Sequence, residues 1–135
     1  MEIRDAEAHR PLMEAALAAH ADRSVDLLIV PDVAEWAARR CGNAQGNPPA
    51  MAVTDGASGG WGILVRRVVS AAEVESILDR IAWNGRHAAH SLLDSPDVFL
   101  RHLVLHELAH LANNWGQEKE DECDDWAFQR LHHEL

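Results

Sequence analysis

Tyrosine is absent from the sequence, and cysteine occurs only twice, at Cys41 and Cys123. Two cysteines are too few for a disulfide framework, so the sequence predicts a reducing, cytoplasmic environment. No apolar run approaches the length of a membrane span, which argues against a membrane protein. The stretch from Met1 to His20 lacks the basic start and the apolar segment of a secretory signal peptide. The expectation is a globular cytoplasmic domain.

Positive charge is also scarce, because 12 lysines and arginines face 22 aspartates and glutamates and give a net charge of −10. A surface this negative repels phosphate backbones, so we expect no nucleic-acid partner. The 135 residues fit one compact domain, and an apolar fraction of 47% is enough to build its core. We therefore expect residues 1–135 to form a single domain. The nine histidines are the informative part of the composition, because histidine is the commonest metal ligand in proteins.

Periodic apolar residues predict an α+β domain in which a small, mainly antiparallel sheet packs on helices. Short apolar runs bounded by turn residues predict the strands, and capping-box spacing marks the starts of two helices. A glycine-rich hairpin connection is expected across 55–60, and Gly85 is expected to interrupt a helix. The predicted elements in chain order are a helix at 5–21, a strand at 26–30, a helix at 32–41, strands at 50–54 and 61–69, and helices at 70–93, 95–112 and 118–133.

The strongest motif is His106-Glu107-Leu108-Ala109-His110, inside the helix predicted at 95–112. Residues four apart share one helix face, so both imidazoles can bind one ion with Zn–N bonds of about 2.0–2.1 Å. Glu107 lies about 100° around the helix, where it reaches a metal-bound water instead of the metal. A catalytic zinc needs a third protein ligand, usually a carboxylate, and leaves its fourth position to water.

Two histidines at this spacing could also be surface or capping residues in a histidine-rich chain. Three features favour the metal site. The neighbours of the motif are uncharged, as a buried helix requires: Leu103, Val104, Leu105, Leu108, Ala109, Leu111 and Ala112. The run Asn113-Asn-Trp-Gly116 ends the helix, so the chain can double back. The returning helix carries Glu120 and Asp124 on one face, which offers one carboxylate to the metal and a second to a histidine N–H.

This combination resembles the gluzincin branch of the HExxH zinc metallopeptidases. The short spacing and the run Glu120-Asp-Glu-Cys-Asp-Asp-Trp-Ala127 are most similar to the minimal metallopeptidases of the ImmA/IrrE family. The resemblance covers residues 103–131. It implies a minimal zincin-like domain that binds Zn²⁺ through His106, His110 and Glu120.

The same resemblance implies roles for the other residues of the motif. Glu107 would be the general base and Asp124 would orient a ligand histidine. Only nine residues separate His110 from Glu120, which is short for the family, so Glu122 competes with Glu120 as the third ligand. Cys123 stands where the family has alanine. A packed small side chain is the simpler interpretation of Cys123, although its thiolate can also ligate zinc.

The expected function is a zinc-dependent metallopeptidase that hydrolyses peptide bonds through a metal-activated water, with Glu107 as general base. The expected partner is a protein or peptide substrate, and the family resemblance extends this to a regulatory protein. A zinc-binding regulatory or protein-interaction module with little turnover is the first alternative. An acidic interaction domain without metal, in which the histidines are incidental, is the second.

Further side chains have weaker assignments. His102 lies one turn before His106, but a helix turns 40° over four residues, so a third histidine in the row binds the same ion poorly. Because tyrosine is absent, the group that stabilises a tetrahedral oxyanion must be a histidine, an arginine or a backbone N–H. Arg86, His87 and His90 are the candidates on the preceding helix. The strand at 61–66 is a candidate edge for pairing with an extended peptide.

Overall fold

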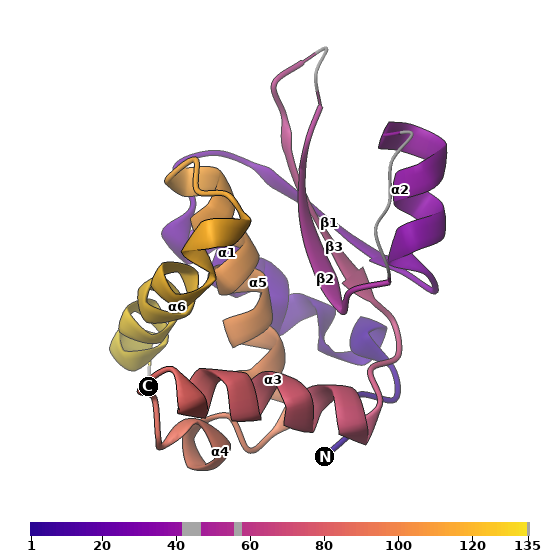
Figure 1. Cartoon of the computed structure of the whole chain (residues 1–135). Helices are drawn as coiled ribbons and strands as arrows, with labels where there is room; N and C mark the ends of the chain where they lie inside the picture. The colour runs from indigo at the N-terminus through magenta and orange to yellow at the C-terminus, as the bar shows by residue number, and fades with distance from the viewer. Residues whose placement is uncertain (42–46, 56–57, 135) are drawn as a thin grey trace.

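The computed structural model describes residues 1–41, 47–55 and 58–134, and it confirms an α+β fold (Figure 1). Most of the described chain is helical, and helices lie on both sides of a small sheet. Among the described residues, no helix has both the length and the apolar composition needed to cross a bilayer. The elements in chain order are η1 (Ala6–His9), α1 (Arg10–His20), β1 (Val25–Val30), α2 (Val33–Cys41), β2 (Ala50–Thr54), β3 (Trp61–Arg66), α3 (Ala71–Trp83), α4 (Ala89–Leu92), α5 (Pro96–Ala112), η2 (Gln117–Lys119) and α6 (Glu120–Glu134).

The sheet has the strand order β1-β3-β2 and is mixed. Strand β3 pairs with β1 in parallel and with β2 in antiparallel fashion. Residues 56 and 57 of the predicted hairpin lie outside the described residues, and a 2.9 Å bond from the Asp55 N–H to the Gly60 carbonyl closes the connection beside them. Because β3 is central and paired on both sides, the prediction that 61–66 is a free edge is wrong. The edge strands are β1 and β2.

Helix α5 is the centre of the packing. It contacts both β2 and β3 of the sheet, α1 on the amino-terminal side, and α6. It opens with the predicted cap, since the Ser95 hydroxyl accepts the Val98 N–H and Pro96 occupies its first turn. Burial of its apolar side chains stabilises the fold by roughly 1.5–3 kcal/mol for each large one. The buried residues of α5 are Phe99, Leu100, His102, Leu103, Val104, Leu105, His106, Leu108 and Ala109.

The helix predicted at 70–93 is divided into α3 and α4. Gly85 lies between them with a φ of 107°, a conformation that side chains with a Cβ rarely adopt, so the expected interruption is confirmed. Helix α3 begins with a capping box, in which the Glu73 N–H donates to the Ser70 hydroxyl over 3.2 Å and the Ser70 N–H donates to Glu73 over 3.1 Å.

The start of α3 is also tied to the end of β3. The buried guanidinium of Arg66 donates to the Glu73 carboxylate and to the carbonyls of Val68 and Asn47. A buried arginine with these acceptors is satisfied, whereas an unpaired one would be costly. The link fixes the direction of α3, whose residues Ile77 and Arg80 line the cavity described below.

Ser70→Ala removes the capping hydroxyl, and we expect it to lower the free energy of unfolding by about 1 kcal/mol. Urea denaturation followed by circular dichroism measures the change. Ser91→Ala, at an exposed position of α4, is the matched control and should stay within about 0.5 kcal/mol of the parent. Equal stability of the Ser70 variant and the parent would show that the cap does not hold α3.

Candidate metal centre

Helix α5 presents His106 and His110 on the same face, as the four-residue spacing predicts. Their ring centroids lie 5.2 Å apart with an interplanar angle of 68°. Beyond His110 the helix ends at Ala112, and Asn114 adopts a left-handed conformation with a φ of 53°. Asparagine tolerates this conformation better than most residues, so the turn reverses the chain within a few residues. Helix α6 then packs against α5.

The Glu120 carboxylate lies between the two imidazoles. Its Oε2 is 3.0 Å from Nε2 of His106, and its Oε1 is 2.9 Å from Nε2 of His110. The two histidines therefore direct the same ring nitrogen toward one acidic group on the first turn of α6. Glu122 is exposed on the same helix. The geometry thus favours Glu120 over Glu122 as the carboxylate partner of this histidine pair.

The second nitrogen of each ring is held by an acceptor. Nδ1 of His106 is 2.6 Å from Oδ1 of Asp124, and Nδ1 of His110 is 2.8 Å from the Trp115 carbonyl. A proton on Nδ1 leaves the lone pair of Nε2 available, which is the tautomer that a metal requires. Asp124 therefore contacts His106 as an orienting carboxylate would.

Asp124 is buried, with 4% of its side chain exposed, and three groups hold it. Besides His106, its Oδ1 lies 3.0 Å from Nε2 of His102, and its Oδ2 accepts from Arg80 over 3.2 Å. Burial alone would raise the pKa of Asp124, but the hydrogen bonds from His102 and His106 outweigh it and hold the pKa well below its usual range. Burial lowers the pKa of His102, so this ring is neutral and Nε2 carries the proton given to Asp124.

The carboxylates and imidazoles of the cluster shift one another's pKa values. Burial would raise the pKa of Glu120, yet the hydrogen bonds from His106 and His110 lower it to about 2. Burial would lower the pKa of His106, but Asp124 and Glu120 raise it to about 10. The pKa of His110 is raised to about 11 by its hydrogen bonds with Cys123 and Glu120. These ionised acids stabilise positive charge on the rings, and a divalent cation can supply that charge in place of the protons.

Glu107 lies beside this cluster without joining it. Its Oε2 is 3.8 Å from Nε2 of His106, and 13% of its side chain is exposed. Burial raises the pKa of the Glu107 carboxyl, partly offset by the two histidines. A backbone hydrogen bond from Ala52 of β2 also reaches this carboxyl. A carboxylate with a raised pKa next to a metal-type cluster has the properties of a general base.

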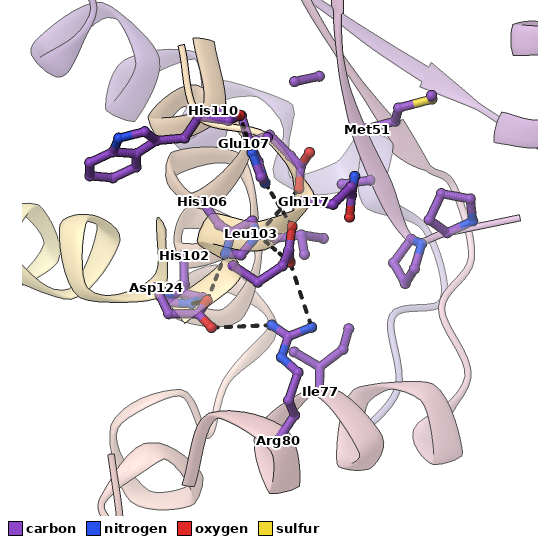
Figure 2. A pocket seen from close by; sticks show the side chains of 17 residues that line it. Met51, Ile77, Arg80, His102, Leu103, His106, Glu107, His110, Gln117 and Asp124 are labelled. Atoms are coloured by element: carbon purple, nitrogen blue, oxygen red, sulfur yellow. Dashed lines mark hydrogen bonds and ion pairs between the residues drawn. The ribbon is translucent and has the colours of Figure 1, made fainter. Parts of the chain in front are cut away.

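These residues line one face of a cavity of about 680 Å³ (Figure 2). The opposite side is formed by the start of β2, and the floor by α3, from which Arg80 reaches up to Asp124. A cleft of this size on a single small domain accommodates several residues of a peptide. The lining residues are Pro48, Pro49, Ala50, Met51, Ala52, Ile77, Arg80, His102, Leu103, His106, Glu107, His110, Trp115, Gly116, Gln117, Glu120 and Asp124.

The oxyanion candidates from the sequence do not line this cavity. Arg86 forms an ion pair with Asp125, His90 contacts Glu75 and Asp79, and His87 is exposed. The arginine that does line the cavity is Arg80, which the sequence analysis missed. In the sequence, the only indication is that Arg80 follows Ile77 by three residues, a spacing that places both side chains on one face of a helix.

Three groups of donors among the described residues have ligand atoms within 4.8 Å of one another. One combines His106 and His110 with Cys123, and a second combines His102 and His106 with Asp124. The third, which contains Glu75, Asp79 and His90, lies on the surface. Glu120 contacts His106 and His110 through different carboxylate oxygens. The sulfur of Cys123 belongs to the first of the three groups, with one nitrogen from each of the same two histidines. Two imidazoles with a carboxylate or a thiolate fit Zn²⁺.

Glu120→Gln removes the negative charge between the rings, and we expect it to weaken zinc binding by at least about 10-fold. Competition with a chromophoric chelator measures the affinity. Glu122→Gln changes an exposed carboxylate of the same helix turn and should leave the affinity unchanged. A larger loss in the Glu122 variant would reverse the choice of third ligand.

Removal of zinc with a chelator should lower the melting temperature of the metal-loaded protein, because the ion holds α5 and α6 together. The decrease should be larger at pH 7 than near pH 5. Protons compete with zinc for the imidazoles, so zinc contributes less stability as the pH falls. Scanning calorimetry with and without chelator at both pH values measures the effect. Melting that the chelator leaves unchanged at both pH values would contradict a metal-linked site.

Comparisons of the chain with protein-family models, with curated proteins and with solved structures find no match. The function must therefore be inferred from the geometry and chemistry of His106, His110, Glu120, Asp124 and Glu107, and from the cavity that they line.

Proposed function

We propose that the chain is a zinc-dependent metallopeptidase that hydrolyses peptide bonds of a protein or peptide substrate in this cavity. One observation carries the proposal. Nε2 of His106 and Nε2 of His110 both face the Glu120 carboxylate, while Asp124 and the Trp115 carbonyl fix their Nδ1 atoms. Two oriented imidazoles and one carboxylate are the protein ligands that a catalytic zinc commonly uses.

In this proposal His106, His110 and Glu120 hold the zinc, and Asp124 keeps the His106 ring in its binding orientation. A bound zinc supplies Lewis acidity, which polarises a peptide carbonyl and acidifies water. The carboxylate of Glu120 offsets part of the charge of the dication. The four residues come from two adjacent helices, so the packing of α6 on α5 assembles the centre.

Glu107 is the general base of the proposed reaction. Its carboxylate takes a proton from the attacking water and passes it to the departing amine, as the scissile C–N bond breaks. Its raised pKa suits this role, because a base that is too weak does not remove the proton. The backbone hydrogen bond from Ala52 fixes the carboxyl between α5 and β2, both of which line the cavity.

The substrate is proposed to bind as an extended segment along β2. Among the described residues β2 is paired only with β3, so its other edge offers backbone groups to an extended peptide, except at Ala52, whose backbone is already hydrogen-bonded to Glu107. Its first residues, Ala50 to Ala52, line the cavity. The guanidinium of Arg80, 42% exposed on the other side, is the arginine available to stabilise the oxyanion.

Glu107→Gln keeps the shape of the side chain but cannot accept the proton, so we expect zinc to stay bound and hydrolysis to fall by about 10²- to 10⁴-fold. Zinc content is measured by elemental mass spectrometry, and hydrolysis by the release of amines from an unfolded protein substrate. Glu122→Gln is the control that should retain both properties.

The same comparison separates a peptidase from a zinc-binding module. A module without turnover binds zinc equally well in both variants and in the parent, and none of the three releases amines. Hydrolysis that survives in the Glu107 variant at the parent rate would remove Glu107 from the reaction.

A further inference from the structure

Cys123 lies on the buried side of the proposed zinc centre. Its side chain is fully enclosed, with 0% exposure, on the turn of α6 that follows Glu120. Its sulfur and one ring nitrogen from each of His106 and His110 are all within 4.8 Å of one another. Residues three apart share a helix face, so Glu120 and Cys123 both point toward α5.

The surroundings of the sulfur are those of a ligand. It forms a hydrogen bond with the His110 side chain. A tetrahedral zinc with bonds of about 2.0–2.3 Å places its nitrogen and sulfur donors about 3.4–3.6 Å apart. The separation of up to 4.8 Å among the three donors is close to this arrangement.

We propose that Cys123 is a zinc ligand, bound as a thiolate together with His106 and His110, the two residues whose ring nitrogens lie within 4.8 Å of its sulfur. This inference rests on the proposed function, since it requires a metal at the same centre. Glu120 does not belong to this group of three donors, so the fourth position of a tetrahedral zinc is left for water or for the Glu120 carboxylate. The cysteine also changes the preferred metal, because a thiolate selects zinc and other soft ions over magnesium, calcium and manganese.

Cobalt substitution tests the inference, because Co²⁺ takes the place of zinc and a thiolate bound to it gives a sulfur-to-metal charge-transfer band in the near ultraviolet. The chain offers a matched control in its only other cysteine, Cys41, the last residue of α2. Among the residues that the structure describes, none of those lining the cavity comes from α2. We expect the band in the parent and in Cys41→Ser, and its loss in Cys123→Ser. Cys41→Ser retains Cys123 as its single cysteine, so a band in this variant assigns the ligand even if the Cys123 variant does not fold.

The visible d–d bands of bound cobalt distinguish the two ways in which the inference can fail. Bound cobalt without a charge-transfer band in the parent overturns the cysteine ligand and leaves the zinc centre in place. Absence of both kinds of band, together with no zinc affinity in chelator competition, overturns the metal centre and the cysteine ligand together. A band that persists in Cys123→Ser but is lost in Cys41→Ser overturns the assignment to Cys123.

Discussion

The buried carboxylate of Asp124 is the interaction on which the arrangement of this molecule depends. Three elements converge on it, with His102 and His106 from α5, Arg80 from α3, and the aspartate itself from α6. A buried charge is tolerated only when its hydrogen bonds are complete, so the three elements cannot separate without exposing it. The same group that holds the helices together also sets the tautomer of His106. Asp124 therefore contributes both to the stability of the fold and to the orientation of the His106 ring.

The local periodicity of the sequence was enough to predict much of the candidate site. The spacing of His106 and His110, the end of their helix, and the shared face of Glu120 and Asp124 follow from 3.6 residues per turn, and the structure brings these four side chains together. The α+β class and the break at Gly85 have the same origin. These features are set by residues close to one another in the chain.

Features that depend on contacts between segments far apart in the sequence could not be predicted from local periodicity. The strand 61–66 is rich in apolar residues whether it is central or at an edge, and only its parallel pairing with β1 makes it central. Arg80 has no sequence signal that separates it from Arg86, because the direction of α3 across the cavity decides which arginine lines it. The sequence favoured a packed small side chain at Cys123, and only the structure places its sulfur near two imidazoles.

The burial of α5 has a consequence for the way in which the proposed zinc centre would bind an ion. The residues between Phe99 and Ala109 are almost all enclosed, and His106 belongs to this stretch. Ligands on a loop must be immobilised when the ion arrives, which costs conformational entropy and weakens binding. Here the ordering of His106 is already complete when the core forms. The proposed zinc centre lines the cavity, so an ion would meet a His106 ring that is already ordered, and its binding would not have to offset the entropy of immobilising that ring.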